Sequence, residues 1–398
     1  LGNTGVTASA CPKVLDTTSP DYGYRPAMKA LAARINGPLN PYHLGYLIGP
    51  RINAGGRIGN AALGAAVLAA SGTVAGRLIV EDIGTAAGGL VLDSLTASLS
   101  GTASPDGPAF ELTSTEGPIT VLGDVIIDGE GDVSISAAGS GGLEATGAVT
   151  VDTAASILID HANRDPTART LAGASLSLAA SGDISGSADS VIASANGGNI
   201  ELTAGGDILV GIANAGDDFL ANAGGAFTAG TVTANVGSDI VIAAASDVRL
   251  DDAEATGLIQ LTSTGGNVLS DGLLDAGTNI QINAALGIDV NDLSAGGFLQ
   301  LIAGGAIDTG ALTIGGALFA SSSAAVTIAS AESGGSIFVS SGGAVDLGTI
   351  QAAFEIDVSG TSIDLASGIS GGDLTLRSGG DINVGFAQAG DDFVASAG

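Results

Sequence analysis

The stretch Gly197–Gly224 reads GGNIELTAGGDILVGIANAGDDFLANAG, and Gly371–Gly398 repeats it as GGDLTLRSGGDINVGFAQAGDDFVASAG. The two copies align without a gap and are identical at 18 of 28 positions. In both copies aliphatic residues alternate with small or polar ones, a pattern that predicts short β-strands with one buried face. Ile208 and Val210 are therefore expected to face inward, and Leu209 outward.

A shorter unit, in which Gly and a small polar residue precede alternating aliphatics, recurs along the chain. Four pairs of such units begin eight residues apart, at Gly123 and Gly131, Gly198 and Gly206, Gly335 and Gly343, and Gly372 and Gly380. Eight residues suffice for one strand and one corner, where Gly is expected to supply a positive φ and Asp, Asn or Ser a side-chain hydrogen bond. Two or three units close a coil of roughly 20 residues, and stacked coils pair each strand with those above and below.

These repeats predict an all-β fold, a parallel β-helix (β-solenoid) of about 16 coils that occupies most of the chain. Small Ser, Thr and Ala residues are expected on the outside of the coils, and the low share of aromatic residues, 3%, favours a narrow interior. An array of β-sandwiches is the alternative fold, but it normally has more turn prolines and core aromatics. No proline occurs after position 166, which favours the solenoid.

The composition changes sharply near residue 77. Residues 1–77 contain seven of the eleven basic residues and two acidic ones, a net charge of +5, whereas residues 78–398 have a net charge of −35. We expect 1–77 to be an incomplete α/β remnant, with helices at Arg25–Asn36 and Asn60–Ala70. We expect 78–398 to be the β-helix, truncated at its C-terminal end. Either a genuine fusion or a chimeric reading frame joins the two parts.

The charge and the rarity of Cys and His exclude several kinds of site. A net charge of −30 repels nucleic acid and anionic membrane surfaces from the repeat region. The single cysteine, Cys11, cannot form an intrachain disulfide, and no Cys/His cluster predicts a zinc site. The uncharged stretch Thr309–Ala331 reaches transmembrane length, but Gly315 and Gly316 interrupt it, so it is predicted to form buried repeat strands.

The segment His43–Ala65, HLGYLIGPRINAGGRIGNAALGA, resembles part of the RecJ-type single-stranded-DNA-specific exonucleases. The resemblance implies that Arg51, Asn53 and Arg57 contact DNA phosphates, and two Arg among glycines can present guanidinium groups and backbone N–H groups to phosphate. The family coordinates two metal ions through upstream Asp and His residues, including an Asp-His-His motif, which this sequence lacks. We therefore expect an inactive remnant. A cytoplasmic 5′–3′ exonuclease with Mn or Mg and single-stranded DNA as partner is the alternative.

Two further motifs allow a structural and a chemical interpretation. Asp160-His161 lies inside a β-repeat and lacks the second His of the metal motif, so His161 is predicted to be a loop or surface residue. The Gly-Asp-Asp-Phe tetrads, Gly216–Phe219 and Gly390–Phe393, are predicted to place solvated Asp at corners with Phe219 and Phe393 inward. Calcium binding at these carboxylates is the alternative. Paired carboxylates would also allow a β-helical carbohydrate-active enzyme, while no nucleophile elbow predicts a serine hydrolase.

The repeat region, residues 80–398, resembles the filamentous-haemagglutinin-like and autotransporter-type β-strand-repeat proteins of Gram-negative bacteria in repeat style and composition. The resemblance implies secretion, a cell-surface or extracellular location, and adhesive or surface-structural work. We therefore expect a non-enzymatic β-helical adhesin or structural repeat protein without a catalytic residue, metal or cofactor. Its expected partners are components of host or neighbouring-cell surfaces, or further copies of itself.

Overall fold

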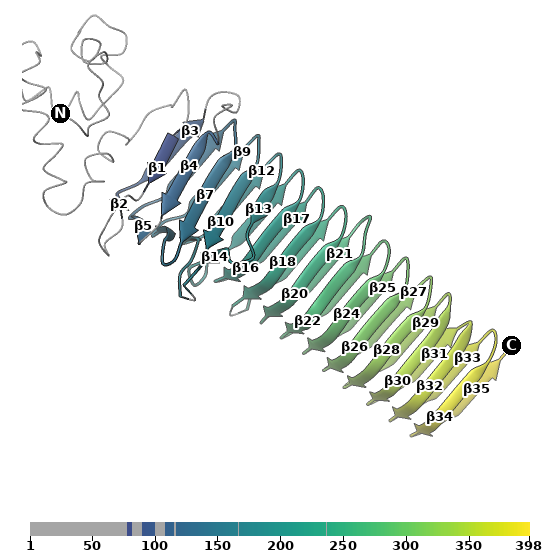
Figure 1. Ribbon diagram of the computed structural model, residues 1–398. Helices are drawn as coiled ribbons and strands as arrows, with labels where there is room; N and C mark the ends of the chain where they lie inside the picture. The colour runs from purple at the N-terminus through teal and green to yellow at the C-terminus, as the bar shows by residue number, and fades with distance from the viewer. Residues whose placement is uncertain (1–77, 82–89, 100–107, 115–116, 166, 236) are drawn as a thin grey trace, which may run out of the picture.

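The computed structural model is a parallel β-solenoid, as predicted, and it has 15 coils (Figure 1). Its strands are stacked in order from the N-terminal to the C-terminal end of a rod, and the strand pairings of the described residues are all parallel, as between Leu95 and Val125. The described residues contain strands, turns and no helix. The structure describes residues 78–81, 90–99, 108–114, 117–165, 167–235 and 237–398.

The strands form two sheets, which we call sheet A and sheet B. Sheet A consists of one strand from each coil: β3 (Leu95–Leu99), β6 (Val125–Gly129), β9 (Val149–Thr153), β12 (Leu176–Ala180), β15 (Ile200–Ala204), β17 (Phe219–Ala223), β19 (Ile240–Ala244), β21 (Ile259–Ser263), β23 (Ile280–Ala284), β25 (Leu299–Ala303), β27 (Leu318–Ser322), β29 (Ile337–Ser341), β31 (Ile356–Gly360), β33 (Leu374–Ser378) and β35 (Phe393–Ala397). Sheet B consists of the other twenty strands: β1 (Leu78–Glu81), β2 (Val91–Leu92), β4 (Phe110–Ser114), β5 (Pro118–Val121), β7 (Val133–Ala138), β8 (Gly142–Ala145), β10 (Ile157–Ala162), β11 (Leu171–Gly173), β13 (Ile184–Gly186), β14 (Val191–Ser194), β16 (Ile208–Ala215), β18 (Phe227–Ala234), β20 (Val248–Ala255), β22 (Val268–Ala276), β24 (Ile288–Ala295), β26 (Ile307–Ile314), β28 (Val326–Ser333), β30 (Ala344–Ala352), β32 (Ser362–Ser370) and β34 (Ile382–Ala389).

The coil changes its construction at β16. The first five coils have three strands each, and their sheet-B strands form two ladders that end in β13 and β14. Both ladders continue into the single strand β16, because Ile184 pairs with Ile208 and Val191 pairs with Ile212. From this strand onward each coil has two strands, and Ile208 pairs with Phe227 of the next coil. This register confirms the predicted coil length of roughly 20 residues.

The long strands of sheet B bend at a tight corner near their middle. In β16, Ile208, Val210, Ala213 and Ala215 are buried, so the inward alternation skips one position between Val210 and Ala213. Gly211 occupies this corner, where a Cβ would lie 2.4 Å from the carbonyl oxygen of Ala188. The close approach of two coils therefore requires a residue without a side chain at this point.

The inward positions form continuous columns of aliphatic residues along the rod. The predicted orientation in the first copy is confirmed, since Ile208 and Val210 are buried and Leu209 is 43% exposed. Stacking of equivalent residues in successive coils removes each inward side chain from water on all sides, which is the main stabilising contribution. The interior contains no charged side chain among the described residues.

One expectation about side-chain placement was wrong. Alanine was expected outside, but many alanines face inward, as Ala221 and Ala223 do in β17. The position of Ala223 also holds alanine in the two adjacent coils, Ala204 and Ala244. Phe219 is fully buried as predicted, and Phe393 continues the inward column of the buried Leu374 as predicted, although it is 49% exposed. Phe393 has a neighbouring strand on one side only, because β35 is the last strand of sheet A.

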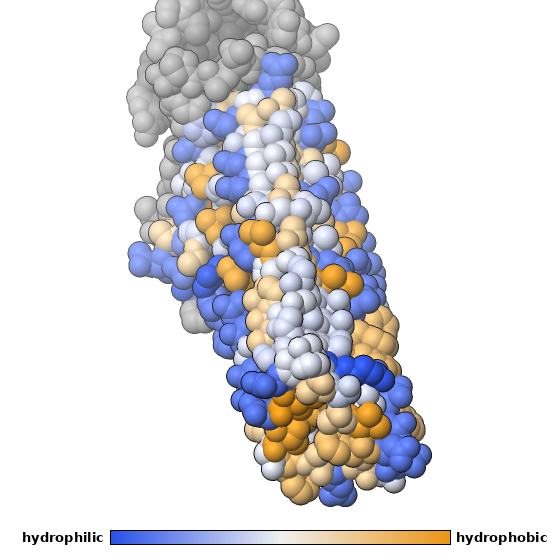
Figure 2. Space-filling view, turned by 90° about the vertical axis from the view of Figure 1, so that its right-hand side faces the viewer, coloured by the Kyte–Doolittle hydropathy of each residue, from blue (hydrophilic) through white to orange (hydrophobic). Residues whose placement is uncertain are grey.

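The outer surface is arranged in lengthwise strips. Because equivalent positions of successive coils lie above one another, residues of similar polarity gather in columns along the rod. Figure 2 shows a pale strip of residues of intermediate hydropathy along the side that faces the viewer, with hydrophilic residues on both flanks. The surface thus differs from one face of the rod to another.

Candidate functional site

The residues that the exonuclease resemblance implies as phosphate contacts, Arg51, Asn53 and Arg57, lie outside the described residues. The same holds for the two predicted helices and the rest of residues 1–77. The predictions for this segment therefore stay predictions. The candidate sites described below belong to the solenoid.

Corner carboxylates of one coil accept hydrogen bonds from the backbone of the next coil. Asp218 Oδ1 accepts the N–H of Asp239 at 2.9 Å, and Asp239 Oδ1 accepts the N–H of Leu258 at 2.7 Å. At another corner, Asp207 Oδ1 accepts the N–H of Ala226 at 2.7 Å. The predicted side-chain hydrogen bond at the corners is confirmed, and a charged acceptor makes it stronger than a neutral one would. These carboxylates hold adjacent coils together.

A glycine of the next coil makes room for two of these carboxylates, those of Asp207 and Asp239. A Cβ on Gly225 would lie 2.0 Å from Asp207 Oδ1, and a Cβ on Gly257 would lie 2.2 Å from Asp239 Oδ1. The predicted positive φ is wrong for most corner units, because Gly131 is the one first glycine of the units that has it among the described residues. Gly225 and Gly257 are needed because the carboxylate of the preceding coil occupies the space of a side chain, whereas at Gly335 and Gly343 the backbone of the preceding coil occupies it.

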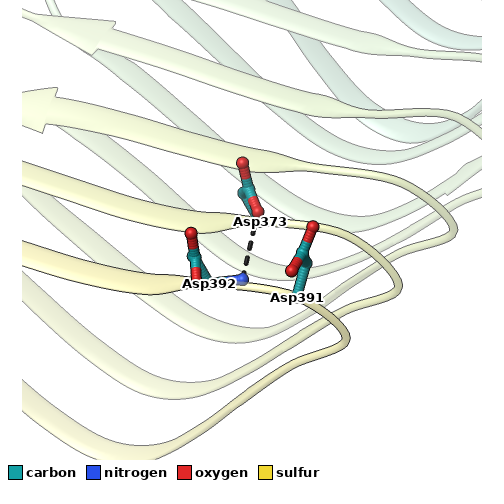
Figure 3. Close-up of side chains that lie close together, drawn as sticks. All are labelled: Asp373, Asp391 and Asp392. Atoms are coloured by element: carbon teal, nitrogen blue, oxygen red, sulfur yellow. Dashed lines mark hydrogen bonds between the residues drawn. The ribbon is translucent and has the colours of Figure 1, made fainter.

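The second Gly-Asp-Asp-Phe tetrad contributes to a group of three exposed carboxylates, those of Asp373, Asp391 and Asp392 (Figure 3). One oxygen of each lies within 4.8 Å of the others. Asp373 Oδ1 accepts the N–H of Asp392 at 3.1 Å, which is the same bond that the other corner carboxylates make. Ca²⁺ takes about six to eight oxygen ligands, so this open corner supplies at most half of them in monodentate form.

His161 is buried inside β10, so its predicted loop or surface position was wrong. The residue is 1% exposed, with Nδ1 2.9 Å from the Thr170 hydroxyl and Nε2 3.1 Å from the Gly139 carbonyl oxygen. The Thr170 hydroxyl also accepts the N–H of Val191 at 2.9 Å, which leaves its own proton for Nδ1. Nε2 then donates to Gly139. The imidazole uses both nitrogens to join neighbouring segments of the solenoid.

A short loop after β10 lowers the pKa of one carboxyl group, that of Asp165. The backbone N–H and the hydroxyl of Thr167 both donate to Asp165 Oδ1, at 2.9 and 2.7 Å. These hydrogen bonds, together with the nearby charge of Arg164, hold the pKa of Asp165 below its ordinary value. The bonds stabilise the loop in the manner of an Asx turn.

Two phenylalanines stack on the outer face of sheet A. Phe319 in β27 and Phe338 in β29 are paired in register, with ring centroids 5.3 Å apart and ring planes 12° apart. They line an open groove of about 530 Å³ that crosses several coils. At one end of this groove Arg377 donates a hydrogen bond to Asp357 at 2.6 Å. Exposed stacked aromatic rings offer apolar contact area to a partner.

The sequence contains a signal for this stack that lies outside the motifs described above. Phe319 and Phe338 are each the second residue of a sheet-A strand, and their strands belong to consecutive coils. The same outward position holds Gln260, Gln281 and Gln300 in the three preceding coils. Alignment of the strands by coil length would have placed these five side chains in one column.

Comparisons with protein-family models, with curated proteins and with solved structures give no match to this chain. The described residues include no helix with the length and hydropathy needed to cross a membrane. The uncharged stretch Thr309–Ala331 forms parts of β26 and β28 and the whole of β27, as predicted.

Proposed function

We propose that the solenoid works as a non-enzymatic adhesin or structural repeat protein at the cell surface or in the extracellular space. The observation that supports this most is the use of the corner carboxylates. Asp207, Asp218 and Asp239 bind the backbone of the next coil, so the most frequent reactive groups of the repeat hold the rod together. What the rod offers to a partner is its long outer faces.

A rod of repeated coils suits many weak contacts that act together. Each coil presents the same outward positions, one strand spacing of about 4.8 Å from the last, so a partner with its own repeats can engage several coils at once. Components of host or neighbouring-cell surfaces are the proposed partners. The acidic character of the chain disfavours nucleic acid and anionic lipid as partners of the repeat region.

Protease accessibility on intact producing cells tests the proposed location. We expect added protease to remove the solenoid while a cytoplasmic marker protein stays intact. Protection of the solenoid to the same extent as the marker would contradict a surface location. A secreted form is expected in the culture medium instead.

Adhesion of beads coated with the purified chain tests the proposed activity. We expect coated beads to attach to cells more strongly than beads coated with the heat-unfolded chain, which has the same composition and charge. Equal attachment of both bead types would contradict an adhesive role for the folded solenoid.

A further inference from the structure

The two sheets of the solenoid differ in charge. On sheet B one outward column contains Asp289, Asp308, Thr327, Asp346 and Asp364, each one coil from the next. The four carboxylates of this column are exposed to solvent. Sheet A has no such column over the same coils, so one side of the rod is acidic and the other is not.

We call the uncharged part of sheet A the neutral face. It comprises β21, β23, β25, β27 and β29 with the corners on both sides of each strand, and none of these segments contains Asp, Glu, Lys, Arg or His. The segments are residues 256–267, 277–288, 296–307, 315–326 and 334–345. In a chain with a net charge of −30, this face lets another acidic molecule approach without like charges at the point of contact.

The neutral face continues across β17 and β19, whose outward side chains are also uncharged, so seven strands have uncharged outward side chains. At about 4.8 Å per strand and about 3.4 Å per residue, this area measures roughly 34 by 17 Å, or about 570 Å². Two such areas in contact bury about 1,100 Å² in total, which exceeds the roughly 1,000 Å² that a specific interface needs.

The face also contains an apolar centre of the kind that stabilises interfaces. Phe319 and Ile302 are each 42% exposed, and Phe319 stacks on Phe338 of the next coil. Gln281 and Gln300 extend the same column with planar amides that can exchange hydrogen bonds with their equivalents. Aromatic residues surrounded by neutral polar side chains are typical of the energetic centre of protein interfaces.

We propose that two copies of this chain pack face to face through the neutral face. The same surface contributes from both copies, so the pair has a two-fold axis, and the acidic sheets B point to solvent on opposite sides. The net charges of the copies still repel each other at longer range, so salt strengthens the association by screening. The inference does not depend on the adhesive role, because it concerns how two rods meet and not what they bind.

Sedimentation velocity of the purified full chain tests the proposal. We expect a dimer fraction that rises between about 1 and about 100 µM protein and between about 50 and about 500 mM NaCl. Phe319→Asp puts a charge at the apolar centre and is expected to weaken dimerisation at least about tenfold. Gln281→Glu is nearly isosteric and is also expected to weaken dimerisation. This second variant keeps the test valid if Phe319→Asp fails to fold.

Leu209→Asp is the matched control, because Leu209 is 43% exposed and lies on sheet B. It adds the same charge to the chain and is expected to leave dimerisation unchanged. A chain that stays monomeric over the whole range overturns the proposal, whatever else the neutral face binds. Dimerisation that neither Phe319→Asp nor Gln281→Glu weakens also overturns the proposal. The same holds if Leu209→Asp weakens dimerisation as much as these variants do, or if added salt weakens it.

Discussion

Ile208 and Ile382 lie in one column of the solenoid core, nine coils apart. The column passes through one residue of every intervening coil, so the offset between the two copies of the sequence repeat equals the combined length of these coils. Val210 and Val384 end a parallel column two residues further along the strands. The long sequence repeat is therefore a whole number of coils, and its two copies have the same orientation relative to the core.

Opposite faces of β16 are expected to respond differently to polar substitution. Ile208→Asp places an unpaired carboxylate in the dry interior and should lower the free energy of unfolding by several kcal/mol. Leu209→Asn should cost less than about 1 kcal/mol, because Leu209 is exposed and Asn383 occupies its position in the second copy. Denaturant melting of both variants measures this difference. If Leu209→Asn were the more damaging, the inward and outward assignment of the strand would be wrong.

The pairing of a corner carboxylate with the next coil's glycine predicts a non-additive double mutant. Gly225→Ala should cost about 1–3 kcal/mol, because the new methyl group meets Asp207 Oδ1. Asp207→Ala should cost about 1 kcal/mol through the lost hydrogen bond to Ala226. The double variant should be more stable than the sum of the single effects implies, by at least about 0.5 kcal/mol. Additive effects in a denaturant double-mutant cycle would show that the carboxylate does not require the glycine.

The buried histidine is expected to be structural. His161→Ala removes both ring hydrogen bonds and leaves a cavity, so it should lower the free energy of unfolding by about 2–4 kcal/mol. Asp160→Ser is the control, since Asp160 is half-buried and pairs with Ser136 of the preceding coil; it should change stability by less than about 0.5 kcal/mol. Equal melting of the two variants would contradict the bridging role of the imidazole.

Calcium is expected to leave the solenoid's stability unchanged. The carboxylates of Asp373, Asp391 and Asp392 are exposed, and Asp373 is already bonded to the backbone of Asp392. Thermal melting with about 5 mM calcium or with chelator should give the same transition temperature, since binding would raise it by mass action. A calcium-dependent rise that Asp391→Asn abolishes would establish a site and contradict this expectation.

The strand pattern and the coil length could be predicted from sequence, because each depends on residues within one coil. The presence of side-chain hydrogen bonds at the corners could also be predicted, from the Asp, Asn and Ser residues there, but their partners lie in the next coil. The alternation around Ile208 fixes which face is buried, and the eight-residue spacing of Gly198 and Gly206 corresponds to the consecutive strands β15 and β16. The predicted number of about 16 coils is slightly larger than the 15 observed. The difference arises because the first five coils are longer than the rest.

The features that sequence reasoning missed depend on contacts between coils. Burial of His161 requires the Gly139 carbonyl and the Thr170 hydroxyl, which neighbouring segments bring to the imidazole. The need for Gly225 arises from a carboxylate in the preceding coil and not from its own φ. Likewise, the Phe319–Phe338 stack exists because two coils are in register. A single repeat unit contains no information on these neighbours.

The hydrogen bonds between coils run along the axis of the rod, as the parallel pairing of Phe319 with Phe338 illustrates. Tension applied to the two ends of the solenoid therefore loads the bonds of an end coil first, and coils detach in succession instead of shearing together. A coil of about 19 residues contributes roughly 4.8 Å to the folded rod and roughly 65 Å to an extended chain. Under mechanical force the rod would lengthen stepwise by more than about tenfold, and the detachment of each coil would absorb work.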